Sequence, residues 1–194
     1  MNPKDLKQDV AHNEGALAPI TLVLGGARAG KSRFAEDLVG WCARPVYIAT
    51  AEALDAEMRD RIHHHRARRG HHWINAEAPI ELAQCLQEWN HAGSAVVVDC
   101  LTLWLNNLLA NGRDITLETR RLVCTLHGHQ GAVVFVSNEV GWGIVPEHKL
   151  ARDFRDHLGR LHQEIAALAQ RVFILVAGIP MVIKDTLAEN SKAH

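Results

Sequence analysis

The segment "GGARAGKS" (Gly25–Ser32) constrains the fold of this chain more than any other stretch. It fits the pattern G-x-x-x-x-G-K-[ST] at every fixed position. The apolar run Ile20–Gly26 predicts a buried strand before it, and a helix is expected from Lys31 to about Trp41. A glycine-rich turn between them aims backbone N–H groups and a helix N-terminus at one point, where they stabilise a phosphate group. The predicted phosphate loop consists of Gly25, Gly26, Ala27, Arg28, Ala29, Gly30, Lys31 and Ser32.

Two polar groups of this loop suit a nucleotide. The ammonium of Lys31 can reach the β- and γ-phosphates, and the hydroxyl of Ser32 can bind Mg²⁺. A second oxygen ligand for Mg²⁺ is expected at the end of a neighbouring strand, where Asp99 closes the run "VVVD". Asp99 also stands where it could cap a helix beginning at Leu101. Lys31 is therefore a candidate catalytic residue, and Ser32 and Asp99 are candidate metal ligands.

Strand and helix patterns alternate along the rest of the chain. Further strands are expected at Pro45–Thr50, His72–Glu77, Ala95–Cys100, Ala132–Glu139 and Arg171–Gly178, and further helices at Leu54–Arg69, Pro79–Trp89, Leu101–Leu109, Leu117–His127 and Glu147–Ala169. This order predicts an α/β protein with a mostly parallel central sheet covered on both faces. With the phosphate loop, it indicates a three-layer P-loop NTPase-type (RecA-like) fold. We expect one domain at residues 19–185, a disordered extension at 1–18 and a flexible tail at 186–194.

Composition excludes several classes of protein. The chain has 194 residues, of which 47% are hydrophobic, and a formal net charge of −1, so no basic field favours nucleic acid. Its four cysteines (Cys42, Cys85, Cys100 and Cys124) form no CxxC pair, which indicates reduced thiols in a cytosolic protein. No apolar run approaches the roughly 20 residues that span a bilayer. The N-terminal segment is polar, so we expect a cytoplasmic protein without a membrane span.

The stretch "RIHHHRARRG" (Arg61–Gly70) places three histidines among arginines. On an ideal helix only His65 falls within about 20° of Met58 on the apolar face, while His63 and His64 point elsewhere. A zinc site is disfavoured because none of the three has a histidine four residues on. A solvated helix explains His63 and His64. His65 remains a candidate nucleophile for a nucleotide α-phosphate, with the nearby arginines stabilising the phosphate charge and lowering the histidine pKa.

These segments together resemble one family, the bifunctional adenosylcobinamide kinase / adenosylcobinamide-phosphate guanylyltransferase of cobalamin biosynthesis. The resemblance covers the chain from Ile20 to about Lys184. It rests on "GGARAGKSRFAE", "YIATAEALDAEMRDRIHHHRARR", "VVVDCLTLWLNNLL", "SNEVGWGIVPE", "ARDFRDHLGRLHQ" and "VAGIP". The middle and late segments are far more specific than the phosphate loop, which many unrelated enzymes share.

The resemblance implies roles for individual residues. Family members carry a histidine that is guanylylated, in a pattern resembling R-I-x-x-H, and His65 fits it here, with His64 as the alternative one residue away. Guanine-nucleotide contacts are implied at Thr50, Ala51, Arg66, Ala67, Arg68, Arg69, Glu77 and Asp99. Relatives often have Ser at Ala29 and usually Asn at His162. Trp142 could face cobinamide or a subunit, or cover the core.

The resemblance also implies an activity. The chain would phosphorylate adenosylcobinamide with ATP or GTP and Mg²⁺, then transfer GMP from GTP through His65 to give adenosyl-GDP-cobinamide. The expected assembly is a homo-oligomer, a trimer, with the corrinoid site between subunits. Two alternatives remain: a P-loop kinase of another small molecule, which forms no covalent GMP, and a RecA-like nucleotide switch that turns over no cobinamide.

Overall fold

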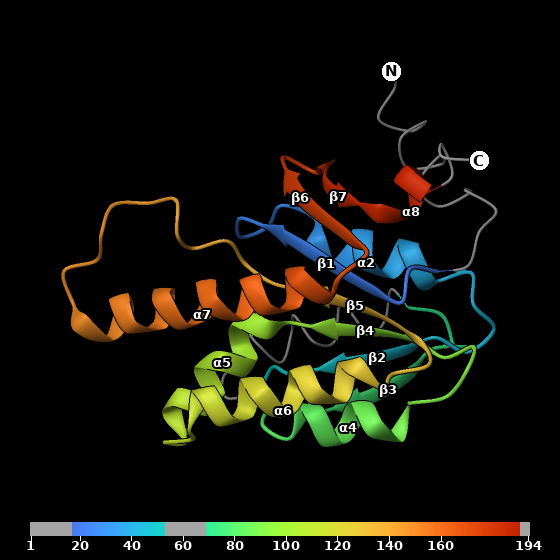
Figure 1. The fold of residues 1–194 in the computed structure, drawn as a ribbon, viewed down its shortest axis with the longest axis horizontal. Helices are drawn as coiled ribbons and strands as arrows, with labels where there is room; N and C mark the ends of the chain where they lie inside the picture. The colour runs from blue at the N-terminus through green and yellow to red at the C-terminus, as the bar shows by residue number, and fades with distance from the viewer. Residues whose placement is uncertain (1–16, 53–68, 191–194) are drawn as a thin grey trace.

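A computed structural model describes residues 17–52 and 69–190 of the chain (Figure 1). The strands of this part are β1 (Ile20–Gly25), β2 (Val46–Ala49), β3 (Ile74–Glu77), β4 (Ala95–Asp99), β5 (Ala132–Val136), β6 (Arg171–Val176) and β7 (Ile179–Asp185). The helices are α2 (Lys31–Val39), α4 (Leu82–Glu88), α5 (Leu101–Ala110), α6 (Ile115–His127), α7 (Lys149–Leu168) and α8 (Thr186–Asn190). The expected extension at 1–18 and the expected helix Leu54–Arg69 lie almost wholly outside the described residues.

The described strands form one sheet in the order β3-β2-β4-β5-β1-β6-β7. Every neighbouring pair is parallel except β6 and β7, which are antiparallel. Parallel strands cannot be joined by a tight turn, so the chain leaves the sheet between them, and the described helices cover both of its faces. The mostly parallel sheet expected from the alternating pattern is confirmed.

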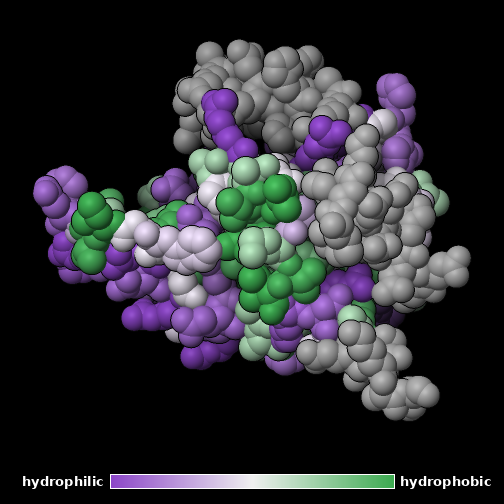
Figure 2. All heavy atoms as spheres, turned by 90° about the horizontal axis from the view of Figure 1, so that it is seen from above, coloured by the Kyte–Doolittle hydropathy of each residue, from purple (hydrophilic) through white to green (hydrophobic). Residues whose placement is uncertain are grey.

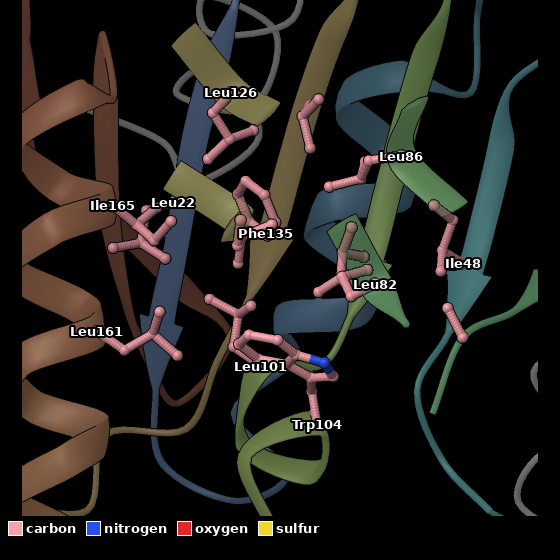
Figure 3. Close-up of a cluster of buried hydrophobic side chains, with 14 of the residues drawn as sticks. Leu22, Ile48, Leu82, Leu86, Leu101, Trp104, Leu126, Phe135, Leu161 and Ile165 are labelled. Atoms are coloured by element: carbon pink, nitrogen blue, oxygen red, sulfur yellow. The ribbon is translucent and has the colours of Figure 1, made fainter. Parts of the chain in front are cut away.

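Two hydrophobic clusters hold the layers together. One packs α4, α5, α6 and α7 against one face of the sheet, with Trp104 and Phe135 among its largest buried side chains (Figure 3). The other packs α2 against the opposite face, where the rings of Phe34 and Phe173 meet edge to face with centroids 5.1 Å apart. The sheet is therefore covered on both faces, as a three-layer α/β fold requires.

β7 is a strand that the sequence pattern did not predict. It follows β6 through a two-residue turn in which Ala177 and Gly178 both have positive φ, 51° and 80°. That geometry matches the right-handed twist of a hairpin. β7 lies at the edge of the sheet and leaves most of its apolar side chains exposed, so it lacks the alternation that marks a half-buried strand. Pro180 within it is tolerated because an edge strand has one unpaired side.

Several element ends differ from the expected ones. The strand expected to reach Glu139 ends at Val136, and the helix expected from Glu147 begins at Lys149. α6 begins two residues early, because the side chain of Asp114 accepts a hydrogen bond from the Leu117 N–H at 3.0 Å and caps it. α8 forms within the segment expected to be a flexible tail. The proposed domain limits stay a prediction.

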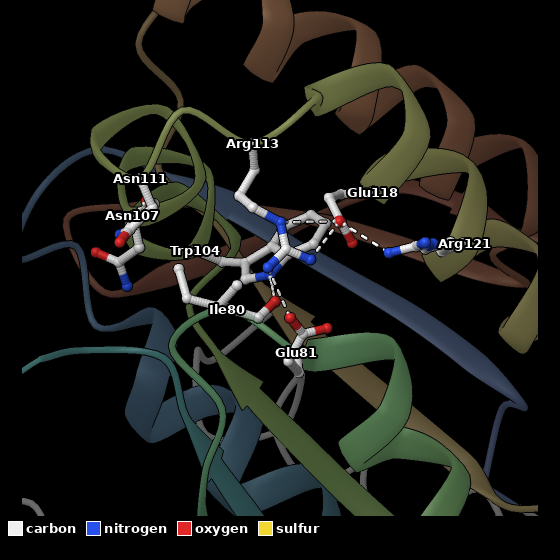
Figure 4. A network of polar contacts seen from close by, with 8 residues as sticks. All are labelled: Ile80, Glu81, Trp104, Asn107, Asn111, Arg113, Glu118 and Arg121. Carbon is white, nitrogen blue, oxygen red and sulfur yellow. Dashed lines mark hydrogen bonds and ion pairs between the residues drawn. The ribbon is translucent and has the colours of Figure 1, made fainter.

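An ion-pair network around the buried carboxylate of Glu118 links the start of α4 to α6 (Figure 4). The guanidinium of Arg113 contacts Glu118 and Glu81, both at 2.7 Å, and Arg121 reaches Glu118 at 3.1 Å. Nearby, the Asn107 carboxamide donates to the Thr50 carbonyl at 2.8 Å and to the Pro79 carbonyl at 3.1 Å. Helix α5 thereby holds the end of β2 and the start of the α4 region, next to the carboxyl edge of the sheet.

Candidate functional site

The phosphate loop lies between β1 and α2, as expected. Gly25 has φ 148°, and a Cβ built on it would lie 2.5 Å from the Leu175 carbonyl oxygen, so a side chain there is excluded by β6. Gly30 has φ 92° and occupies the N-cap position of α2. A residue with a side chain would be strained in that left-handed conformation. The two glycines let the loop turn sharply from β1 into the helix.

The N-terminus of α2 is open to an anion. No side chain caps it, and its first turn has no acidic residue. Gly26, Ala27, Arg28 and Gly30 are exposed around it. The free N–H groups of a first turn and the helix dipole together favour negative charge at this point. The arrangement suits a phosphate group.

Lys31 is held at the centre of this loop. Its Nζ donates to the carbonyl oxygen of Gly26 at 2.7 Å and to Oδ1 of Asn138 at 2.7 Å. Burial lowers the pKa of Lys31 below its ordinary value, while the neighbouring groups of Cys100 and Asp99 oppose that shift. Burial also raises the pKa of the Cys100 thiol to about 12, so that thiol is uncharged at neutral pH. The Asp99 carboxylate is therefore the neighbouring anion that opposes this lowering of the Lys31 pKa.

Asp99 ends β4 in the same register row as Ala49 of β2 and Val136 of β5. Its Oδ2 accepts a hydrogen bond from the Tyr47 hydroxyl at 2.7 Å. The N-cap position of α5 is Cys100, which makes no side-chain cap. The alternative that Asp99 caps this helix is therefore wrong, and its carboxylate lies at the carboxyl edge of the sheet. Ligands of open α/β sheets bind at this edge.

Thr50 is fully buried and is tied to the residue after Asp99. Its hydroxyl donates to the Cys100 carbonyl at 2.8 Å and accepts from the Cys100 N–H at 2.7 Å. Its own N–H donates to the Asp99 carbonyl at 3.0 Å. These bonds lock the end of β2 to the end of β4, with half-buried Ala51 next along the chain. Nucleotide contacts of Thr50 and Ala51 stay a prediction.

Arg69, near the end of the histidine–arginine segment, lies within the described residues, and its side chain makes several contacts. Its side chain is 4% exposed, pairs with Glu36 at 3.2 Å and donates to Oδ1 of Asn75 at 2.9 Å. Its guanidinium carbon lies 3.5 Å from the centre of the Tyr47 ring, a cation–π contact. Arg69 thus binds to α2, β3 and β2 at once. His64, His65, Arg66, Ala67 and Arg68 lie outside the described residues.

Glu77 is exposed at the end of β3, in the register row of Ala49. Ala49 also pairs with Asp99, so one strand separates Glu77 from Asp99. Neighbouring strands are about 4.8 Å apart, which puts the two carboxyl-bearing positions about 10 Å from each other. The described residues thus gather the phosphate loop, Thr50, Ala51, Asp99 and Arg69 closely, with Glu77 at the outer end of the row.

Sequence reasoning assigned no role to two residues of this site, Tyr47 and Asn138. Tyr47 is the aromatic residue in an otherwise aliphatic strand, and Asn138 is a polar residue two positions after the buried strand β5. His162, whose role was left open, is buried and contacts Ser137 Oγ through Nε2 at 2.7 Å. Trp142 is 76% exposed, so the alternative that it covers the core is wrong.

Ser32 and Asp99 are the predicted ligands of a Mg²⁺ ion. No group of three or more His, Cys, Asp or Glu side chains gathers within residues 17–52 and 69–190. Mg²⁺ does not need such a cage, since it keeps several waters and binds one or two protein oxygens together with substrate phosphates. The hydroxyl of Ser32 on the first turn of α2 and the carboxylate of Asp99 fit that requirement. Metal contacts of Ser32 and Asp99 stay a prediction.

Known proteins match this chain closely in sequence. The family model for cobinamide kinase / cobinamide phosphate guanyltransferase matches residues 21–183. A bifunctional adenosylcobalamin biosynthesis protein CobP of Pseudomonas aeruginosa is 48% identical over 166 residues, which cover 84% of this chain and 96% of that protein. The CobU protein of Escherichia coli is 40% identical over 178 residues, covering 84% of this chain and 98% of that protein. That of Salmonella typhimurium is 41% identical, with the same coverage.

Solved structures resemble this chain in fold. An ATPase from the type III secretion system of pathogenic bacteria has a TM-score of 0.54 at 10% identity, covering 89% of this chain and 53% of that one. The ATPase domain of G40P has a TM-score of 0.51 at 12% identity, covering 86% of this chain and 77% of that one. These likenesses agree with the expected P-loop, RecA-like fold. None of the helices in the described parts of the chain is long and apolar enough to cross a membrane.

The family match decides between the three functions that the sequence left open. The matched family has both activities, which excludes a kinase that lacks the guanylyltransferase step and a nucleotide switch without catalysis. The chain belongs to the cobinamide kinase / cobinamide phosphate guanyltransferase family and is a bifunctional transferase of cobalamin biosynthesis.

Proposed function

We propose that the substrate is adenosylcobinamide and that both reactions use the edge of the sheet beside Lys31 and Asp99. In the first reaction the aminopropanol hydroxyl oxygen attacks the γ-phosphorus of ATP or GTP, and the nucleoside diphosphate leaves. In the second, a histidine nitrogen attacks the α-phosphorus of GTP, and pyrophosphate leaves. The phosphate of adenosylcobinamide phosphate then displaces the histidine and gives adenosyl-GDP-cobinamide.

The kinase half rests on the hydrogen bonds of Lys31. Its ammonium has three donors, and Gly26 and Asn138 accept two of them. The remaining donor and the open N–H groups of the α2 N-terminus stabilise negative charge on the transferred phosphoryl group. Catalysis of phosphoryl transfer consists mainly of such positioning and charge stabilisation. This lysine geometry is the single observation that carries the proposal.

Mg²⁺ would bind the Ser32 hydroxyl and the Asp99 carboxylate. When bound, it neutralises charge on the β- and γ-phosphate oxygens. Asp99 is suited to this role because the Tyr47 hydroxyl occupies Oδ2 at 2.7 Å and thereby orients the carboxylate. Ordered partners of this kind commonly orient metal-binding groups.

The guanylyltransferase part of the proposal rests on the described residues at the two ends of the histidine segment. Before the segment, Thr50 is locked to Cys100, the residue after Asp99. After it, Arg69 lies on the ring of Tyr47, whose hydroxyl contacts Asp99. Both junctions therefore lie beside the proposed nucleotide site. We assign the nucleophile to His65, with His64 as the alternative, and the contacts with nucleotide to Arg66, Ala67 and Arg68.

Self-association is part of the proposal. The expected homotrimer would place the corrinoid between subunits. The edge strand β7 exposes Ile179, Met181, Val182 and Ile183, and Figure 2 shows hydrophobic side chains gathered on this side of the molecule. An exposed apolar edge strand favours association with another chain. Light scattering combined with size-exclusion chromatography tests the trimer, and a monomer at micromolar concentration would contradict it.

A product assay tests the two reactions together. The protein is incubated with adenosylcobinamide, ATP and Mg²⁺, and then with GTP. The corrinoids are separated by chromatography and identified by mass spectrometry. We expect adenosylcobinamide phosphate first and adenosyl-GDP-cobinamide after GTP. Lys31→Ala should lose the first product, whereas Lys149→Ala, which removes an exposed lysine on α7, should keep both. A wild-type protein that leaves adenosylcobinamide unchanged would overturn the substrate assignment.

A further inference from the structure

A series of hydrogen bonds leads from Lys31 into the protein, away from the phosphate loop. Lys31 Nζ donates to Oδ1 of Asn138 at 2.7 Å. The backbone N–H of Asn138 donates to Oγ1 of Thr102 at 2.7 Å, and that hydroxyl lies 3.1 Å from Oγ of Ser137. Ser137 Oγ lies 2.7 Å from Nε2 of His162. We call Asn138, Thr102, Ser137 and His162 the Asn138 relay.

The relay joins three elements at the phosphate site. Thr102 lies on the first turn of α5, His162 lies on α7, and Ser137 and Asn138 follow β5. Thr102, Ser137 and His162 are all buried. Buried hydroxyls and imidazoles that are hydrogen-bonded to one another hold a defined geometry, because breaking any bond leaves a polar group unsatisfied.

The hydroxyl groups of the relay can all donate in one direction, from Thr102 to Ser137 and from Ser137 to His162. The Thr102 hydroxyl accepts from the Asn138 N–H and can donate to Ser137. The Ser137 hydroxyl can then donate to an unprotonated Nε2 of His162. This requires the neutral imidazole with its proton on Nδ1. Every hydroxyl of the relay is then both a donor and an acceptor.

The backbone around Asn138 is fixed as well. The Ser137 N–H donates to the Val23 carbonyl at 3.0 Å, and the Glu139 N–H donates to the Gly25 carbonyl at 3.0 Å. Both acceptors belong to β1, which leads into the phosphate loop. The Asn138 carboxamide therefore starts from a backbone that is bound on both sides to the strand carrying that loop.

We infer that Asn138 is a positioning residue for Lys31 in phosphoryl transfer, and that Thr102, Ser137 and His162 hold Asn138 in place. An ammonium has three donors, and the fixed acceptors at Gly26 and Asn138 determine the direction of the third. The Asn138 relay thus aims one Lys31 N–H at the transferred phosphoryl group. This inference rests on the proposed role of Lys31 in the kinase reaction.

Two substitutions separate positioning from folding. Asn138→Ala removes the acceptor of Lys31, and Thr102→Val removes the relay hydroxyl while keeping the side-chain shape. A misaligned catalytic group lowers the rate of the chemical step by about 10- to 100-fold, while ground-state binding changes little. We expect a loss of that size in kcat for Asn138→Ala and about tenfold for Thr102→Val. The ATP Kd from calorimetry should change less than about threefold in both.

Matched controls accompany these variants. Thr102→Ser restores the hydroxyl and should restore kcat, and Asn106→Ala removes an exposed carboxamide of α5 and should have wild-type kcat. His162→Asn keeps a hydrogen-bonding group towards Ser137 and should lose less activity than His162→Leu. Circular dichroism establishes that each variant is folded before rates are compared.

The outcomes distinguish the inference from the proposed function. An active wild-type protein with full kcat in folded Asn138→Ala would overturn the inference alone. Equal kcat losses in Thr102→Val and Thr102→Ser would likewise overturn the role of the relay. A wild-type protein that transfers no phosphate to adenosylcobinamide would overturn both. The predicted pattern, low kcat with near-normal ATP binding and rescue by Thr102→Ser, supports both.

Discussion

The Tyr47 hydroxyl donates a hydrogen bond to the Asp99 carboxylate at 2.7 Å, and Arg69 lies across the ring of the same tyrosine. One buried aromatic side chain therefore contacts both the acidic end of β4 and the residue that closes the histidine segment. Burial, followed by the Asp99 charge, raises the pKa of Tyr47 well above its ordinary value. Its hydroxyl consequently stays protonated, and remains a donor to Asp99, at neutral pH.

Tyr47→Phe should impair the use of Mg²⁺ by the kinase reaction. The variant keeps the ring that packs against Trp73 and Arg69 but removes the donor to Asp99. Loss of a group that orients a metal-binding carboxylate lowers metal affinity by about 10- to 100-fold. The Mg²⁺ concentration that gives half the maximal rate should rise by about that factor, and a titration of rate against Mg²⁺ measures it. A Tyr47→Phe titration that overlays the wild-type curve would exclude this role.

Arg69→Met should destabilise the protein strongly. The ion pair with Glu36 is buried, with side-chain exposures of 4% for the arginine and 9% for the glutamate. Removing one member of a buried pair costs about 3–5 kcal/mol, although the unbranched apolar side chain of Met fills part of the space and offsets part of this loss. We expect the free energy of unfolding, from urea titration, to fall by about 3 kcal/mol.

A double-mutant cycle with Glu36→Gln measures the interaction between Arg69 and Glu36 apart from their other contacts. If the two side chains interact directly, the double variant should lose less than the sum of the single variants, by about 1–3 kcal/mol. Arg69→Lys is the conservative control, because it keeps the charge but not the planar group on the Tyr47 ring. Additive losses in the cycle would show that the ion pair contributes nothing.

His162 should make stability depend on pH. Burial lowers the pKa of His162 below its ordinary value of 6.5, and the Glu139 carboxylate opposes this only in part. The unfolded chain therefore takes up a proton near pH 6.5 while the folded protein does not. The contribution of His162 to folding stability is therefore fully present above pH 6.5. It is lost as the pH falls from 6.5 towards the lowered pKa of His162 in the folded protein.

The His162→Asn variant provides the comparison. Urea titrations at pH 7.5 and pH 5.5 measure the free energy of unfolding of both proteins, and the other histidines contribute equally to each. The wild type should lose more free energy of unfolding than His162→Asn on acidification, because only its unfolded chain takes up the proton of His162. An equal loss in the two proteins would contradict the burial effect on His162.

The sequence predicted those parts of the fold that depend on local patterns. The strand before "GGARAGKS", the helix after it and the strands ending at Asp99 and Val136 follow from runs of apolar residues and from glycine chemistry. β7 could not be predicted in this way, because an exposed edge strand needs no alternation and its pairing with β6 is a tertiary contact. Element ends were wrong where capping decided them, as at Asp114.

The functional site likewise combines residues that a local sequence pattern predicts with contacts that only the folded structure shows. The residues of the phosphate loop could be found because the backbone needs glycine at Gly25 and Gly30, a requirement that leaves a mark in the sequence. Asp99 could be found as the polar end of a buried strand. The hydrogen bonds from Tyr47 to Asp99 and from Lys31 to Asn138 join residues 52 and 107 positions apart, and no local pattern records such pairs. They required the parallel order of the sheet.

The most direct test of this account is a covalent label from GTP. The protein is incubated with α-labelled GTP and Mg²⁺, denatured, and then exposed to acid, and His65→Ala, His64→Ala and His63→Ala are treated in parallel. The account predicts label that survives denaturation, is lost in acid as a phosphoramidate is, and is absent in His65→Ala. Loss in His64→Ala alone would move the nucleophile by one residue. Label that persists in all three variants, or no covalent label in the wild type, would contradict a guanylyl-histidine in this segment.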